Sequence, residues 1–249
     1  MQIPALAGLI LIFFSVILLI GLFLLKDRVK ASFRDIPAFA NFTKALGNAV
    51  ENGSRIHFSL GSAGLSNSRT AASFASLSVL RQSAELSAAS DKSPLATSGD
   101  ATLTILSQDS LKIAHNIAGV DHRYEASSGR LAGLTPFSYA AGTVPTIYDE
   151  DISANMIAGS FGVEVGLLSD ASERTRSFTL AATDSLPAQS VLYANANEVL
   201  IGEELFASGA YLDIGRTHLV SLYVQDILRW IIVATLLGGA AMKLLAGLL

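Results

Sequence analysis

Residues 55–68 read RIHFSLGSAGLSNS, and this stretch decides the fold of the central part of the chain. Polar and apolar side chains alternate over Arg55–Leu60, which predicts a short β-strand. The Gly- and Ser-rich residues that follow are typical of a turn. Ser68 can then cap a helix that runs to about Ser87. A strand, a turn and a helix in this order are the beginning of an α/β layered domain.

The same alternation continues along the chain. The patterns predict further extended segments at 95–98, 123–127, 156–161, 163–168, 177–183 and 198–201, and further helices at 100–119, 185–196 and 203–212. Strands that alternate with helices favour a mostly parallel sheet with helices on its faces. We therefore expect an α/β domain with a Rossmann-like layered sheet, flanked by N- and C-terminal transmembrane helices.

The composition supports the membrane part of this interpretation. Of the 249 residues, 51% are hydrophobic and only 15% are charged, whereas soluble domains carry roughly 25% charged residues. The runs Ile3–Leu25 and Trp230–Leu249 are each about as long as a membrane-spanning helix. We expect transmembrane anchors at 1–25 and 226–249, a basic juxtamembrane segment at 26–47, and the α/β domain at 48–225.

The charges beside the first run predict an orientation. Lys26, Arg28, Lys30 and Arg34 follow it, and no basic residue precedes it. Because basic residues concentrate on the cytoplasmic side of membrane spans, we expect a two-span protein of the cell membrane with a cytoplasmic central domain.

The second anchor contains small residues and one charge. Ala234, Gly238 and Gly239 can let another helix approach closely, although ordinary membrane sequence explains them equally well. Lys243 lies near the end of the run, where its ammonium group can reach the lipid headgroups. The alternative for Lys243 is a charge that lines a pore or pairs with a partner.

The glycine-rich loop is the strongest candidate for a binding site. A loop between a strand and a helix N-terminus presents free N–H groups to an anion. The candidate ligand-binding residues in this loop are Gly61, Ser62, Gly64, Ser66, Ser68 and Arg69. The loop matches neither the dinucleotide fingerprint nor a Walker A motif, so an ordinary turn between a strand and a helix remains the alternative.

Other site classes find no support in the sequence. The absence of Cys excludes disulfides, zinc–cysteine sites and iron–sulfur clusters. The four His residues lack metal-ligand spacing, and no nucleophile elbow is present. A net charge of −4 argues against nucleic-acid binding. We therefore expect no catalytic residues, no metal and no cofactor.

Four strings resemble an uncharacterised family of prokaryotic membrane-anchored proteins with a domain of unknown function. They are RIHFSLGSAGL (55–65), SGDATLTILSQDSLKIAH (98–115), VLIGEELFASGAYL (199–212) and HLVSLYVQDILRW (218–230). The resemblance brings no activity with it. It implies that the family-type motifs include Gly61, Gly64, Asp100, Asp109, Glu203, Glu204 and Gly209.

Three hypotheses about function follow. The first is a non-enzymatic scaffold that assembles into a homo-oligomer such as a ring, because tethering in two dimensions raises the effective concentration. Its partners are the lipid bilayer and other membrane proteins. The second is a membrane-tethered nucleotide- or ligand-binding regulatory domain that uses the glycine-rich loop. The third is a hydrolase whose site the sequence does not reveal.

Overall fold

The computed structural model describes residues 3–24, 34–62, 64, 70–212 and 216–248. The chain divides into two compact units, Asp35–Ile214 and the pair of segments Met1–Arg34 and Gly215–Leu249.

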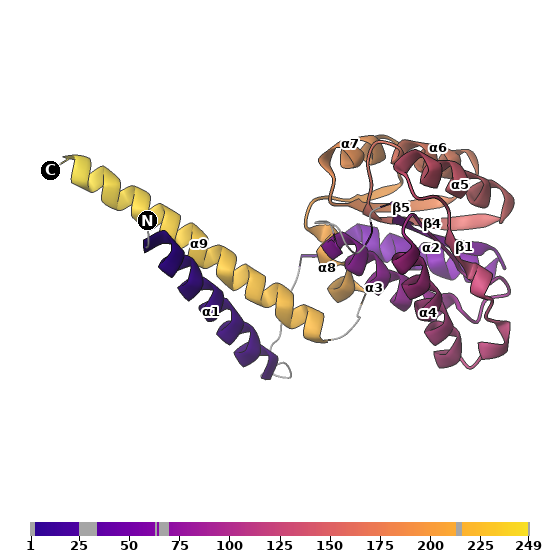
Figure 1. The fold of residues 1–249 in the computed structure, drawn as a ribbon, viewed down its shortest axis with the longest axis horizontal. Helices are drawn as coiled ribbons and strands as arrows, with labels where there is room; N and C mark the ends of the chain where they lie inside the picture. The colour runs from indigo at the N-terminus through magenta and orange to yellow at the C-terminus, as the bar shows by residue number, and fades with distance from the viewer. Residues whose placement is uncertain (1–2, 25–33, 63, 65–69, 213–215, 249) are drawn as a thin grey trace. The chain divides into compact units, whose positions relative to one another are not determined.

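The unit formed by the two ends of the chain contains α1 (Ile3–Leu24) and α9 (Arg216–Leu248), which lie side by side and run in opposite directions (Figure 1). The described apolar side chains of both helices are largely exposed. Within α9, Leu219–Leu244 is the one stretch of the described residues that is long and apolar enough to cross a membrane. The apolar part of α1, Gly8–Leu24, is shorter. Of the two predicted spans, only the second therefore has a candidate helix.

The larger unit is built on a six-stranded sheet in which every strand pairing is parallel. Its order is β3-β2-β1-β4-β5-β6, so the chain winds outward from β1 in one direction and then from β4 in the other. This order defines the doubly wound, Rossmann-like arrangement, and the predicted α/β class is confirmed. The strands are β1 (Arg55–Gly61), β2 (Leu95–Ser98), β3 (Gly129–Leu131), β4 (Ile152–Ser160), β5 (Phe178–Thr183) and β6 (Glu198–Leu200).

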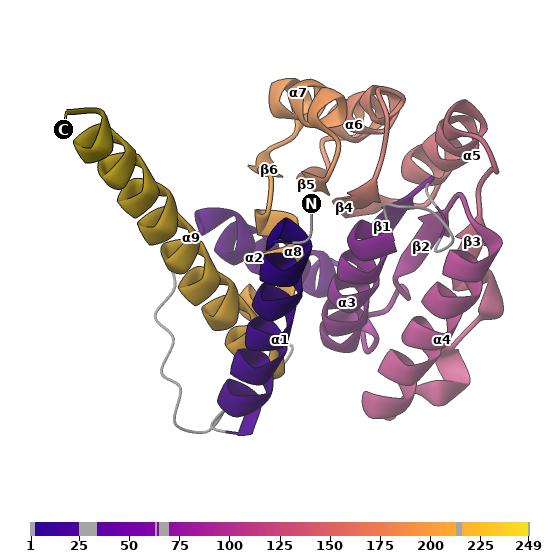
Figure 2. The ribbon, with the colours of Figure 1, turned by 60° about the vertical axis from the view of Figure 1, so that its left-hand side comes forward.

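Helices cover both faces of this sheet (Figures 1 and 2). One face carries α2 (Pro37–Glu51), α3 (Thr70–Ser87), α4 (Ala101–Ile117) and α8 (Glu204–Tyr211). The other carries α5 (Pro136–Asp149), α6 (Val165–Arg174) and α7 (Leu186–Asn195). Two short 3-10 turns, η1 (Asp121–Arg123) and η2 (Ala126–Ser128), connect α4 to β3.

The alternation in β1 sorts its side chains between two cores. Ile56, Phe58 and Leu60 join the apolar core under α2, α3 and α4. The residues between them, His57 and Ser59, are equally buried but face the opposite side of the sheet. One strand therefore supplies both an apolar core and, on its other face, buried polar groups.

Some predicted elements are confirmed and others are wrong. The segment 123–127 is not a strand, because it overlaps the end of η1 and the start of η2, and the edge strand follows at Gly129–Leu131. The segment 163–168 belongs mostly to α6. A short apolar run of this kind cannot be assigned by periodicity, and helix period places Val165 and Leu168 in the core.

Two helices lie where the sequence analysis expected none. The basic juxtamembrane segment 26–47 overlaps α2, which buries Phe39, Phe42 and Leu46 at helical spacing. The helix α5 begins at a capping box formed by Thr135 and Ser138. The compact unit consequently runs over 35–214, whereas we expected 48–225.

The two ends of this unit meet. Phe39 in the first turn of α2 stacks on Tyr211, the last residue of α8, with ring centroids 4.9 Å apart and planes 9° from parallel. Stacked aromatic pairs add about 0.5–1.5 kcal/mol beyond their burial. The chain therefore enters and leaves the domain at one place.

Candidate functional site

The sheet has one topological switch point, between β1 and β4, where the two halves of the fold wind apart. Ligands of open parallel sheets bind outside the carboxyl ends of the strands at this point. Two glycines bring the strands together there. A Cβ at Gly61, whose φ is +90°, would lie 2.5 Å from the carbonyl oxygen of Ser160, and one at Gly159 would meet the backbone of Leu60. Only glycine fits either position.

The described part of the predicted loop lies at this switch point. Gly61 ends β1, and its carbonyl oxygen accepts the N–H of Gly99 after β2 (2.9 Å). The N–H of Ser62 donates to the carbonyl oxygen of Ser160 (3.2 Å). At Gly64, a Cβ would overlap the carboxylate of Asp100. Gly61, Ser62 and Gly64 are therefore brought together with the ends of β2 and β4. Ser66, Ser68 and Arg69 lie outside the described residues.

Carboxylates line this edge of the sheet. Asp100 caps α4, where its Oδ1 accepts the N–H of Leu103 (3.0 Å). Glu164 is 3% exposed, and its Oε1 accepts from the N–H of Gly162 (2.8 Å). Asp184 follows β5, and its Oδ1 is buried without a hydrogen-bond partner among the described residues. Sequence reasoning missed Glu164 and Asp184. The signal that could have found them is an acidic residue just after a buried strand.

A network of buried, hydrogen-bonded polar side chains lies beneath α5 and extends from the middle of the sheet toward the switch point. His57 Nδ1 lies 2.8 Å from Asn155 Oδ1, and His57 Nε2 lies 2.9 Å from Thr97 Oγ1. The hydroxyl of Tyr139 lies 3.3 Å from Thr97 Oγ1 and 2.5 Å from Ser59 Oγ. All five residues are buried. These hydrogen bonds join β4, β1 and β2 to α5 on the face of the sheet away from the larger apolar core.

The partners of His57 assign its proton. An amide oxygen only accepts, so Nδ1 donates to Asn155, and Nε2 accepts the hydroxyl hydrogen of Thr97. Burial lowers the pKa of His57 to about 4, although its hydrogen bond to Asn155 acts to raise it, and the nearby charge of Arg130 lowers it further. Burial likewise raises the pKa of the Tyr139 hydroxyl. This network of buried side chains is therefore neutral at pH 7, and His57 stabilises the fold rather than binding a ligand.

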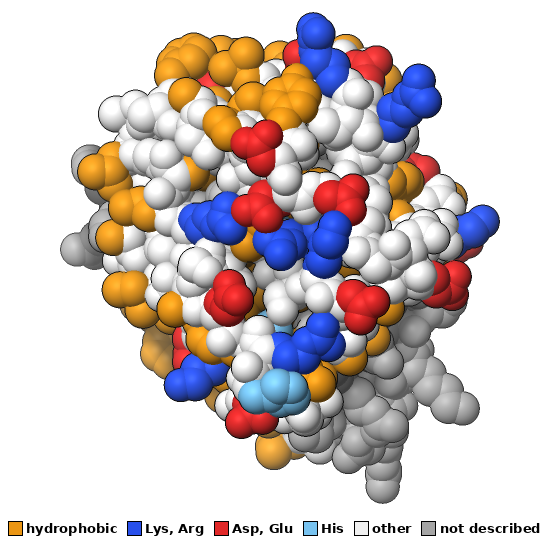
Figure 3. All heavy atoms as spheres, turned by 90° about the vertical axis from the view of Figure 1, so that its right-hand side faces the viewer, with side chains coloured by type: hydrophobic (Ala, Val, Ile, Leu, Met, Phe, Trp, Pro, Cys, Tyr) orange, Lys and Arg blue, Asp and Glu red, His pale blue; other side chains and the backbone are white. Residues whose placement is uncertain are grey.

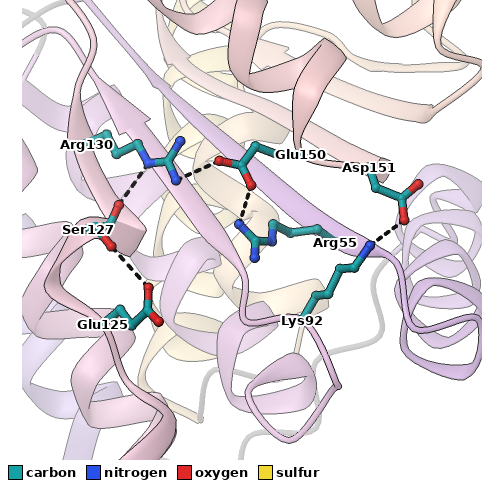
Figure 4. Close-up of polar contacts among 7 residues, drawn as sticks. All are labelled: Arg55, Lys92, Glu125, Ser127, Arg130, Glu150 and Asp151. Atoms are coloured by element: carbon teal, nitrogen blue, oxygen red, sulfur yellow. Dashed lines mark hydrogen bonds and ion pairs between the residues drawn. The ribbon is translucent and has the colours of Figure 1, made fainter.

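The opposite, amino edge of the sheet is highly charged (Figure 3). A cleft of about 290 Å³ opens here between the starts of β1, β2 and β3. Figure 4 shows the ion pairs beside it. The carboxylate of Glu150 bridges Arg55 (2.6 Å) and Arg130 (2.8 Å), and Asp151 pairs with Lys92 (2.6 Å). Glu150 directly follows α5, and its carboxylate holds two cations.

The remaining candidate residues play local roles. His115 is buried and is bonded to the carbonyl oxygen of Leu111 and to Ser93. No group of His, Asp and Glu in the described part of the chain is arranged to hold a metal ion. Ala234, Gly238, Gly239 and Lys243 are all exposed on α9.

A family model described as a domain of unknown function, DUF6754, matches residues 3–248. The chain belongs to this family. Searches of curated proteins and of solved structures each found no match. The match extends over both terminal helices as well as the central domain, so the DUF6754 domain comprises both units of the structure.

Proposed function

We propose that this DUF6754 chain is a membrane-tethered ligand-binding domain whose site is the switch point between β1 and β4. The proposal rests on one observation. The strand order places the switch point, where the two halves of the sheet diverge, at the glycine-rich loop. Fold alone does not name a ligand, so the class of ligand is argued from the side chains present.

These side chains favour a ligand rich in hydroxyl groups. The hydroxyl of Ser62 and the carboxylates of Asp100 and Glu164 lie at the ends of β1, β2 and β4. Carboxylate oxygens accept hydrogen bonds from sugar hydroxyls, and an acidic residue serves the ribose in this way in dinucleotide-binding folds. A nucleotide therefore fits the site best, with its ribose toward Asp100.

The proposal is tested by measuring the unfolding temperature of the full-length protein in mild detergent, with and without each of a panel of nucleotides. A ligand present at about 100 times its Kd stabilises the domain by ~2.7 kcal/mol. In Gly64→Ala, the new methyl group displaces the Asp100 carboxylate, so the ligand-induced shift should disappear. Gly47→Ala is the matched control, because it adds the same methyl group to an exposed position of α2 with no atom within 4 Å.

Two results would contradict the proposal. One is that no nucleotide at millimolar concentration shifts the unfolding temperature. The other is that Gly64→Ala and Gly47→Ala respond to the ligand alike.

The tethering is the second part of the proposal. We propose that α1 spans the membrane together with α9, and that the central domain lies in the cytoplasm. The apolar surface of α1 supports this arrangement, since Ile17 is 66% exposed and Leu24 is 77% exposed. The basic residues that follow α1 in sequence support the orientation.

A scaffold that self-assembles in the membrane is the second candidate function. It is favoured by α9, where Gly238 and Gly239 would meet no atom within 4 Å even if each carried a Cβ. Small residues on an uncovered helix face let a helix of a second copy pack closely. Native mass spectrometry should then show an oligomer that Gly238→Ile disrupts and Leu237→Ile does not. A monomer at every protein concentration would exclude this candidate.

A further inference from the structure

The connection between β3 and α5 carries two large apolar side chains that no part of the described chain covers. Leu134 is 71% exposed and Phe137 is 64% exposed. Because all the strands of the sheet are parallel, this connection leaves β3 at the same carboxyl edge at which the glycine-rich loop leaves β1. Two uncovered apolar side chains therefore lie at the edge of the sheet that contains the proposed ligand site.

The β3–α5 connection is also a direct neighbour of the switch point. The N–H of Ala132 donates to the carbonyl oxygen of Ser98 at the end of β2 (2.9 Å). A Cβ at Gly99 would lie 2.7 Å from the Cα of Ser62 and 3.1 Å from the carbonyl oxygen of Gly133. The loops that follow β1 and β3 therefore lie against the same glycine, one on each side of the end of β2.

The backbone that carries Phe137 is held firmly. Thr135 and Ser138 form the capping box of α5, in which the N–H of Thr135 donates to Ser138 Oγ (2.9 Å). Pro136 occupies the first helical position, where its ring fixes φ. A Cβ at Gly133 would lie 2.4 Å from the carbonyl carbon of Ser138, so the connection packs closely on the first turn of α5. A ligand that binds to Phe137 does not have to order this backbone.

We propose that Leu134 and Phe137 form the subsite for the base of the nucleotide, and that the base stacks on the ring of Phe137. This inference rests on the proposed function, which places the ribose toward Asp100. The base is bonded directly to the ribose, and Asp100 follows the glycine that lies against the β3–α5 connection. A base attached to that ribose therefore reaches this connection. Aromatic side chains stack on every kind of base, because each base has a π-face.

The charges of this region favour the base over the phosphate as the occupant. Residues 131–138 contain no charged side chain, and the carboxylate of Asp100 lies beside them at the start of α4. A phosphate placed here would meet no cation from the connection and would be repelled by Asp100. A neutral, flat base instead covers apolar surface, which stabilises the complex.

Isothermal titration of the full-length protein in mild detergent with adenosine monophosphate and with ribose 5-phosphate tests the inference. The two probes share the ribose and the phosphate and differ in the base. The wild type should bind adenosine monophosphate about tenfold more tightly than ribose 5-phosphate. Phe137→Ala should remove this advantage and leave the Kd of ribose 5-phosphate unchanged, whereas Phe137→Trp keeps an aromatic ring and should retain the advantage.

Tyr193→Ala is the matched control. Tyr193 is 72% exposed in the last turn of α7, which ends at the opposite, amino edge of the sheet. Its substitution removes an exposed aromatic ring of similar size and should change neither Kd. The unchanged affinity of Phe137→Ala for ribose 5-phosphate shows at the same time that this variant is folded.

The possible outcomes separate this inference from the proposed function. If neither probe binds, both are wrong. If the wild type binds the two probes with the same Kd, or if Phe137→Ala weakens both probes alike or neither of them, the base does not stack on Phe137. In those cases the inference is overturned, and the proposed function stands.

Discussion

Lowering the pH should destabilise the central domain through His57. In the folded domain the pKa of His57 is about 4 because the ring is buried, whereas an unfolded chain gives His a pKa of ~6.5. The unfolded state therefore binds more protons between these values. The stabilisation from the neutral ring is complete above pH 6.5 and is lost as the pH falls toward 4.

The size of the effect follows from the two pKa values. One pKa unit corresponds to ~1.4 kcal/mol, so the full difference amounts to roughly 3 kcal/mol below pH 4. Between pH 7.5 and pH 5.0, the free energy of unfolding should fall by about 2 kcal/mol on account of His57 alone. This is a large part of the stability of a typical domain.

Urea denaturation at several pH values, followed by circular dichroism in a mild detergent, measures the effect. The wild type is compared with His57→Gln, whose amide offers one donor and one acceptor toward Asn155 and Thr97 but does not titrate. The substitution itself changes the free energy of unfolding at every pH. Only the difference between the two proteins in how this free energy depends on pH reports on the titration of His57. Equal losses of stability in the two proteins between pH 7.5 and pH 5.0 would refute the reasoning.

Three further predictions follow from the structure. Gly61→Ala should lower the free energy of unfolding by about 2–4 kcal/mol in urea denaturation, because the position combines a positive φ with a clash against Ser160. Gly119 also has a positive φ but has open space around it, so Gly119→Ala should lower the same free energy by only about 1 kcal/mol. Tyr139→Phe should lower the free energy of unfolding by about 1–3 kcal/mol, since it leaves the buried hydroxyl of Ser59 without its partner; the exposed Tyr193→Phe should change it by less than about 0.5 kcal/mol. The chain contains no Cys, so Ser127→Cys provides a single label on an exposed residue, and a membrane-impermeant maleimide should modify it only after cell lysis; labelling of intact cells would reverse the proposed orientation.

The sequence predicted the fold where local patterns are strong. The alternating strand β1 and the helix predicted at 100–119 are both found in the structure. It failed at 163–168, because a helix of ten residues shows too few apolar positions to reveal its period. It also failed at α2, because the predicted basic juxtamembrane segment 26–47 covers most of this helix. Local composition there masked the helical spacing.

The sequence likewise revealed the site at the switch point and missed the cleft at the amino edge. A glycine-rich turn after a strand is visible in sequence because its residues are contiguous. The cleft at the amino edge was not visible, because Arg55, Lys92, Arg123 and Arg130 are far apart in sequence and are brought together only by the parallel sheet. The pairing of Glu150 was not visible either, since its two arginine partners lie 95 and 20 positions earlier in the chain.

The stacked pair of Phe39 and Tyr211 has a mechanical consequence. Tension applied through the two flanking segments would enter and leave the domain at adjacent points. Such a load peels the first and last helices apart one contact at a time, and it does not shear the sheet along its strands. The domain should therefore yield at low force from this corner while the hydrogen bonds between β1 and β4 stay intact.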